Sequence, residues 1–170
     1  MTITFTVFGI AQTAGSKRAF PFKKSDGTLG VRVSDDNPKG DNWKHAVAYS
    51  SREAYSGDLL SGPLAVTMRF YRPRPKGHFG KHGLNRTGLE CSSPATRPDV
   101  LKLARCAEDA LTGVLWRDDA QIVEEHLFKH WGEPARMEIE IQALAEAEAQ
   151  LFENPEDMPA PWAKVRSVPF

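Results

Sequence analysis

The sequence predicts an α+β fold in which a single mixed β-sheet is covered by two main helices. Three segments, residues 2–9, 64–71 and 137–142, alternate apolar and polar side chains as half-buried strands do. Between the second and third of these, residues 99–112 place apolar side chains at helical spacing. The chain has 170 residues, 41% of them hydrophobic, which is sufficient for one domain with a buried core.

The first 60 residues are predicted to form a strand, a long connection and a helix. Residues 2–9 alternate threonine with Ile, Phe and Val, which is typical of a half-buried strand. Residues 10–40 are rich in Gly, Lys, Asp and Pro and are predicted to be a connection. Asp41 or Asn42 then caps a helix that ends before Gly57.

A second alternating strand begins after Pro63 and is followed by a long basic loop, residues 72–97. Between positions 72 and 89 this loop contains no acidic residue. Loops of this length inside a compact domain are usually functional or mobile. The apolar face of the strand consists of Leu64, Val66, Met68 and Phe70.

The second half is predicted to continue with a helix and three strands. Pro98 suits the first turn of the helix, and Gly113 closes it. Residues 114–117 and 121–130 are predicted to pair as a hairpin around two aspartates, giving the order β-α-β-α-β-β-β. A short helix near residues 143–152 and an acidic, Pro-rich tail follow. We expect a domain at 1–144 and an extension at 145–170.

Charge is distributed unevenly along the chain, although the net charge is zero. Residues 1–97 contain 15 Lys and Arg against 7 Asp and Glu, whereas residues 98–170 contain 7 against 15. This asymmetry favours a surface for a polyanion in one half and an acidic site or tail in the other, although a functionless salt-bridged surface also accounts for it.

The distribution of apolar, basic and cysteine residues excludes or disfavours several classes of protein. No run of 18 apolar residues exists, and the N-terminus lacks the basic region of a signal peptide. Cys91 and Cys106 form no CxxC pair, which argues against a disulfide scaffold or a cysteine zinc site. No Gly-rich loop for a nucleotide cofactor is present. We therefore expect a reduced, cytoplasmic protein that is not associated with a membrane.

Three aspartates are the candidates for metal chemistry. Asp99 begins the second helix, and Asp118 and Asp119 follow its end. Clustered carboxylates repel one another unless a cation lies between them, and hard oxygen ligands suit Mg²⁺. Adjacent residues on a strand point to opposite faces, so only one of the pair can share a site with Asp99. A polar turn and a favourable helix N-terminal charge explain the same residues without any metal.

A family resemblance favours the metal interpretation. The chain reads Arg97-Pro98-Asp99, then Leu103 and Arg105, then Asp109-Ala110-Leu111-Thr112-Gly113, then Trp116 and Asp118-Asp119-Ala120-Gln121-Ile122. In order and spacing this strongly resembles the RusA-type Holliday junction resolvases, in forms similar to those of phages and prophages. Weaker matches, such as Gly15-Ser16-Lys17-Arg18, extend the resemblance from residue 1 to about residue 144.

The resemblance implies a homodimeric, Mg²⁺-dependent endonuclease, with Mn²⁺ as a plausible substitute, that nicks four-way DNA junctions symmetrically during recombination and repair. By position, Asp99 and Asp119 match catalytic carboxylates of the family. Arg105 matches the basic residue that assists at the phosphate, and Asp118 could support the metal. Such a protein acts in the bacterial cytoplasm, the host's if it is encoded by a phage.

One position departs from the family pattern. The second helix aspartate of the family is Leu101 here, on the same side of the helical wheel as Arg105. Asp118 or Glu124 could supply the missing carboxylate, or the site could bind metal poorly. Alternatively, the chain is a DNA-binding module that has lost cleavage. A nuclease for flaps or forks is a third possibility.

The basic segments are the candidate DNA contacts, because Lys and Arg bind backbone phosphates with little sequence preference. A dimer with two such surfaces would select junctions by shape. The predicted contacts are Lys17, Arg18, Arg72, Arg74, Lys76, Lys81 and Lys102.

Overall fold

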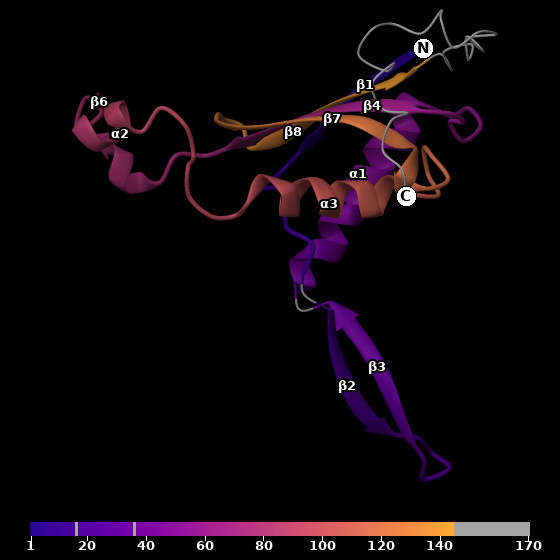
Figure 1. The fold of residues 1–170 in the computed structure, drawn as a ribbon. Helices are drawn as coiled ribbons and strands as arrows, with labels where there is room; N and C mark the ends of the chain where they lie inside the picture. The colour runs from indigo at the N-terminus through magenta and orange to yellow at the C-terminus, as the bar shows by residue number, and fades with distance from the viewer. Residues whose placement is uncertain (16, 36, 145–170) are drawn as a thin grey trace, which may run out of the picture.

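The computed structural model describes residues 1–15, 17–35 and 37–144, and it confirms the α+β class (Figure 1). Its main sheet has four strands in the order β1-β8-β4-β7. β8 pairs antiparallel with both β1 and β4, whereas β7 pairs parallel with β4, so the sheet is mixed. The strands are β1 (Thr2–Phe8), β4 (Leu64–Arg72), β7 (Ile122–Trp131) and β8 (Arg136–Ala143).

Two helices, α1 (Pro38–Ala54) and α3 (Val100–Leu111), lie together on one face of this sheet (Figure 1). α1 begins earlier than predicted: its N-cap is Asn37, whose side chain accepts a hydrogen bond from Lys39 N. Asp41 instead lies in the first turn, where its charge favours the helix dipole. α3 begins after Asp99, and Gly113 follows it with a φ of 76°, a conformation that favours glycine.

The core lies between the sheet and these helices. All four apolar residues predicted for one face of β4 are fully buried, which confirms the period-2 pattern of that strand. β8 contributes every second residue to the same core, and α3 contributes its predicted apolar stripe. The buried residues of β8 and α3 are Met137, Ile139, Ile141, Leu103, Ala104, Cys106, Ala107, Ala110 and Leu111.

The prediction of a connection over residues 10–40 is wrong. Most of this segment forms an antiparallel hairpin of β2 (Lys17–Lys23) and β3 (Leu29–Asp35), which extends away from the sheet and helices (Figure 1). β3 alternates Leu29, Val31 and Val33 with Gly, Arg and Ser, which is a strand signal that the prediction of a connection overlooked. β2 does not share this signal, because its apolar residues occupy the consecutive positions 19–22. Its turn is fastened by Asp26, which accepts hydrogen bonds from the backbone and side chain of Thr28.

The predicted strand at residues 114–117 is also wrong. These residues form a turn that places Trp116 in the core, linked to Leu60 and Thr112 by isolated bridges. A short 3₁₀ turn, η2 (Asp119–Gln121), then leads directly into β7. The apolar run Val114 to Trp116 is therefore a buried turn, which periodicity does not distinguish from a short strand.

The basic loop after β4 contains small elements of its own at the far end of the molecule (Figure 1). They are η1 (Lys76–His78), β5 (Phe79–Gly80), β6 (Gly83–Leu84) and α2 (Arg86–Glu90). The helix predicted near residues 143–152 and the tail lie outside the described residues, apart from the first two positions. Within the described ranges, every helix is too short or too polar to cross a bilayer.

Candidate active site

Asp99 lies at the N-terminus of α3 with its carboxylate exposed. The residue is the N-cap by position, yet its side chain makes no capping hydrogen bond. Lys102 Nζ lies 3.9 Å from Asp99 Oδ2, and both side chains are about two-thirds exposed. The preceding loop is held by Lys129, whose Nζ donates to the carbonyls of Thr96 and Pro98 at 2.8 and 2.9 Å. A rigid loop therefore presents an accessible carboxylate.

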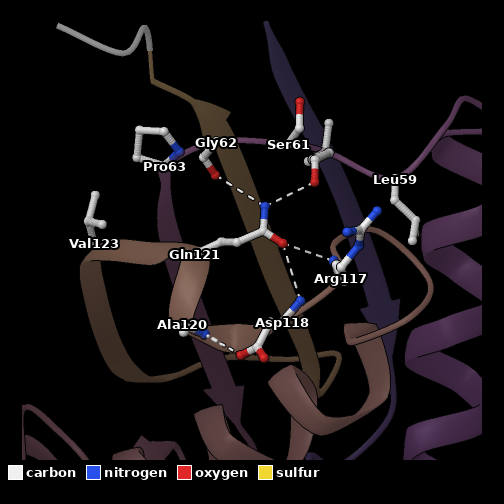
Figure 2. Close-up of a pocket in the computed structure, with 10 residues that line it drawn as sticks. Leu59, Ser61, Gly62, Pro63, Arg117, Asp118, Ala120, Gln121 and Val123 are labelled. Atoms are coloured by element: carbon white, nitrogen blue, oxygen red, sulfur yellow. Dashed lines mark hydrogen bonds between the residues drawn. The ribbon is translucent and has the colours of Figure 1, made fainter.

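Asp118 and Asp119 lie beyond the opposite end of α3, in a turn that Gln121 organises (Figure 2). Gln121 Nε2 donates to the carbonyls of Leu60 and Gly62 at 3.0 and 3.1 Å. Its Oε1 accepts from the backbone N–H groups of Arg117 and Asp118 at 2.9 and 3.2 Å. One amide side chain thus satisfies four backbone groups and fixes the aspartate pair relative to β4.

The two aspartates line different cavities. Asp118 borders the groove shown in Figure 2, and its Oδ1 accepts a hydrogen bond from Ala120 N at 2.9 Å. This bond, followed by one with Asp119, holds the pKa of Asp118 below its usual value. Asp119 borders a separate cavity, of about 300 Å³, beside α3. The neighbouring carboxylates therefore border different cavities, although their side chains interact with each other.

Two further carboxylates share the cavity of Asp119. Glu108, in the last turns of α3, and Glu125, in β7, line it together with Asp119. Burial is the largest cause that raises the pKa of Glu108 to about 8, followed by a hydrogen bond with Glu125 and the charges of Glu125, Asp119 and Asp109. Crowded carboxylates of this kind favour either a proton or a cation between them.

Sequence reasoning missed Glu108 and Glu125, although a signal existed for the first. Leu101, Arg105 and Glu108 are separated by four and three residues and so follow one stripe of α3. Leu101 is 67% exposed and Arg105 is also exposed, which confirms that this stripe lies outside the core. The stripe runs from the end that carries Asp99 towards the end that faces Asp119.

Glu124, a predicted substitute for the missing carboxylate, lies on the wrong side of the sheet. A register irregularity at the start of β7 pairs Ala65 with Glu124 and Val66 with Glu125. Val66 is buried under the helices, so Glu125 shares the face of α3, whereas Glu124 shares the open face. The irregularity shifts the alternation by one residue, which the sequence pattern does not reveal.

Asp99 and Asp119 are not brought together within one chain. Glu108, the helix residue beside Asp119, is nine residues beyond Asp99, or about 13 Å along the helix axis. Oxygens that bind one Mg²⁺ lie about 2.1 Å from the ion, so two ligand oxygens are within about 4 Å of each other. Among the described residues, no three His, Cys, Asp or Glu side chains are arranged to hold a metal ion.

The predicted DNA contacts occupy different environments. Lys76 and Lys81 are exposed in the loop after β4, and Lys102 is exposed on α3. Arg72 is half-buried at the end of β4, where burial lowers the pKa of its guanidinium. Lys17 and Arg18 lie at the start of β2.

Arg74 makes its hydrogen bonds to the backbone of the protein itself. Its Nη1 donates to the carbonyls of Gly88 and Cys91 at 2.8 and 3.0 Å. The guanidinium carbon also lies 5.4 Å from the centroid of the Trp131 ring. These contacts attach α2 to the end of β7, so Arg74 shapes the basic loop from within.

Comparison with known proteins shows the family to which this chain belongs. A curated protein of Bacillus subtilis strain 168, named uncharacterized protein YqaN, is 27% identical over 144 residues, which cover 84% of this chain and 97% of the relative. The family model described as endodeoxyribonuclease RusA matches residues 22–142, a range that includes α3, the aspartate turn, β7 and nearly all of β8. The chain therefore belongs to the RusA endodeoxyribonuclease family.

Proposed function

We propose that this chain is a divalent-metal-dependent endonuclease that resolves four-way DNA junctions by paired nicks. The observation that carries the proposal is the cavity where Asp119, Glu108 and Glu125 meet, at one end of a helix stripe that also presents Arg105. Family membership supplies the substrate class, nucleic acid cleaved at phosphodiester bonds. The catalytic unit would be residues 1–144, with 145–170 as an extension, acting in the cytoplasm.

The carboxylate oxygens of this cavity are of the chemical type that a hard metal ion prefers. Mg²⁺ is bound by one or two carboxylates together with waters and substrate phosphate oxygens, and Mn²⁺ accepts the same ligands. We propose Asp119 as a ligand, with either Glu108 or Glu125 as a second carboxylate in place of the one lost at Leu101. Asp118, engaged in its own turn, would support Asp119 rather than bind metal.

In this proposal a metal held by these carboxylates would supply an activated water and would stabilise charge on the phosphate. Arg105 is exposed on the stripe between the two ends of α3, so its guanidinium can bind a non-bridging phosphate oxygen. Lys102, one turn nearer Asp99, adds a second positive charge on this side of the helix. These two residues hold the substrate backbone, and the carboxylates hold the metal.

We propose further that each site is shared by the two subunits of a homodimer. The separation of Asp99 from Asp119 by most of α3 supports this arrangement, because two dimer-related copies of α3 running antiparallel would place the Asp99 end of one beside the Asp119 end of the other. Two such sites related by a twofold axis would cut opposite strands symmetrically, as resolution of a four-way junction requires.

A DNA-binding module without cleavage is the second candidate function. It is favoured by Leu101, which replaces a carboxylate of the family pattern with an exposed apolar side chain. In this alternative, the chain binds branched DNA through its basic segments and forms no metal-dependent product. Restoring the carboxylate with Leu101→Asp would then create cleavage that the natural chain lacks.

The first prediction tests cleavage directly. An end-labelled four-way junction is incubated with the protein in Mg²⁺, Mn²⁺ or EDTA, beside a linear duplex, a flap and a fork. We expect paired nicks near the crossover that require the metal and are lost in Asp119→Asn, whereas junction binding in EDTA is retained. Asp58→Asn, at an exposed loop aspartate, is the matched control and should cut normally.

Metal binding is measured separately from activity. Mg²⁺ should raise the melting temperature of the natural chain, because a ligand that binds only the folded state stabilises it, and should leave that of Asp119→Asn unchanged. A junction that is bound but uncut at every metal concentration would establish the binding module. Stronger cleavage of the flap or fork would reassign the substrate.

A further inference from the structure

The β2–β3 hairpin is an arm that carries exposed apolar side chains on both faces. Figure 1 shows it extending clear of the sheet and of both main helices. Phe20 and Phe22 are 50% and 47% exposed, and Leu29 and Val31 on the other face are 79% and 66% exposed. A two-stranded hairpin is marginal in water without a surface to pack on, so these side chains need a binding partner.

The Phe22 ring is held in place by a glycine across the hairpin. Phe22 pairs with Gly30, and a Cβ built on Gly30 would lie 2.8 Å from Cζ of the Phe22 ring. The same Cβ would lie 3.2 Å from Cε of Lys24. The ring therefore lies over the backbone of β3 with a lysine stem beside it, and any larger residue at position 30 would displace it.

Positive charge surrounds this aromatic face. Phe20 pairs with Arg32 in the neighbouring strand, so the ring and the guanidinium share one face with Phe22. Residues 17–35 contain five Lys and Arg against two Asp. Aromatic rings interleaved with cations are the pattern by which proteins bind exposed bases and the phosphates that flank them. A protein partner for so basic an arm would need a strongly acidic surface.

We infer that this arm contacts the branch point of junction DNA, with Phe20 and Phe22 stacking on base faces that are open there. In an uninterrupted duplex each base face is covered by its neighbours, whereas a branch point leaves terminal base pairs without one. Seven-residue strands reach about 23 Å, long enough to extend from the body of the protein into the junction centre. The inference rests on the proposed junction substrate, and it names the element that recognises the branch.

The experiment measures binding alone, in EDTA, with the full chain. The probes are a four-way junction with 2-aminopurine next to the branch point and a linear duplex of the same sequence. The variants are Phe20→Ala with Phe22→Ala, the same pair changed to Leu, and Leu29→Ala with Val31→Ala on the opposite face. Melting temperatures and light scattering establish that each variant is folded and has the natural oligomeric state.

We expect both phenylalanine pairs to weaken junction binding by at least about tenfold and to abolish the 2-aminopurine signal, with less than about twofold change on linear duplex. The Leu pair must fail like the Ala pair, because leucine keeps apolar area and lacks a ring. The opposite-face variant should bind the junction normally. Equal loss on both DNAs, rescue by leucine, or a change of oligomeric state in the phenylalanine variants would overturn the inference.

Cleavage of the junction by the natural chain is scored independently. If the junction is bound in a phenylalanine-dependent way but is not cut, the proposed nuclease activity is wrong and the role of the hairpin in binding stands. If the junction is cut but its binding does not depend on Phe20 and Phe22, the inferred role of the hairpin is wrong and the proposed nuclease activity stands.

Discussion

Glu108 shows how one half-buried side chain can link packing to metal chemistry. It lies on the exposed stripe of α3, yet the cavity it shares with Glu125 and Asp119 removes enough water to raise its pKa to about 8. The carboxyl is therefore largely protonated at pH 7 in the metal-free protein. A divalent cation in that cavity would replace the proton, so metal binding should strengthen as the pH rises towards 8.

Glu108→Gln tests this environment through stability. Because the folded pKa of Glu108 exceeds its unfolded value, the folded state loses stability as pH rises from about 4.5 to about 8. Glutamine keeps the shape and cannot ionise, so the variant should melt about 2–4 °C above the natural chain at pH 8 in EDTA. The gain should vanish near pH 5. The magnitude is kept small because the group is about half exposed and solvent screens its charge.

The control for this prediction is Glu124→Gln, one residue before Glu125 in β7. Glu124 lies on the open face of the sheet, so its replacement should change the melting temperature little at either pH. A stabilisation by Glu108→Gln that is the same at pH 5 and pH 8 would show that burial of charge is not its cause.

At the scale of the element, the turn between α3 and β7 depends on Gln121. Its side chain forms hydrogen bonds with two backbone N–H groups and two backbone carbonyls. Without Gln121, water would have to bond to these four partly buried groups. Gln121 therefore has a mechanical role, because it fixes Asp118 and Asp119, which precede it, relative to the start of β4.

Gln121→Ala should destabilise the protein by about 1–3 kcal/mol, because it leaves four partly buried backbone groups without a partner. Gln121→Glu should do no better, since a carboxylate cannot donate to the carbonyls of Leu60 and Gly62. Urea unfolding gives the stability, and hydrogen exchange at the amides of Arg117 and Asp118 reports the turn. Gln12→Ala is the control, because the Gln12 side chain donates to the carbonyl of Ile10, an exposed residue two positions away. Normal amide protection in Gln121→Ala would contradict the assignment.

The elements differ in how far the sequence predicts them. β4, β8 and α3 each bury one side against the core, so the period of their apolar residues predicts both type and boundaries. The β2–β3 hairpin packs no side against the core, and its apolar alternation is confined to Leu29, Val31 and Val33 of β3. Residues 114–117 are buried as a turn, which periodicity does not distinguish from a short strand. Secondary structure can be predicted from apolar periodicity where an element packs one side on the core, and it is harder to predict elsewhere.

The same limit applies to the candidate site. The spacing of the family motif predicts Asp99, Asp119 and Arg105 as site residues, because that motif is local in sequence. The partnership of Glu108 with Glu125 is made across α3 and β7 and depends on a one-residue register irregularity. Arg74 illustrates the converse, since its charge predicted a DNA contact while its hydrogen bonds are made to the protein itself.

At the scale of the whole molecule, positive and negative charge are segregated in space as well as in sequence. The basic residues of the hairpin and of the loop after β4 lie on the elements that project from the body (Figure 1). The carboxylates Glu108, Asp119 and Glu125 lie where α3 meets β7. The acidic cavity lies at the start of β4 and the basic loop follows its other end, so DNA that contacts both would have to extend along the length of the sheet.

The proposed shared site makes a prediction about mixed dimers. Asp99→Asn and Asp119→Asn should each be inactive as homodimers. A heterodimer of the two, purified by two different tags after co-expression, would contain one site with both aspartates and one with neither. We expect it to nick one strand of the junction and to accumulate a nicked junction on a denaturing gel. Sites confined to single chains would leave this heterodimer inactive, because each chain lacks one aspartate.

The reciprocal heterodimer reverses the expectation. When a natural chain is paired with a chain that carries both substitutions, each shared site lacks one aspartate and no nicks should form. If each chain instead held a complete site, the natural chain would still nick one strand. The two heterodimers contain the same number of substitutions in the same fold, so stability and DNA affinity are matched. The pattern of nicks therefore depends on whether the roughly 13 Å along α3 between Asp99 and Glu108 is bridged by a second subunit.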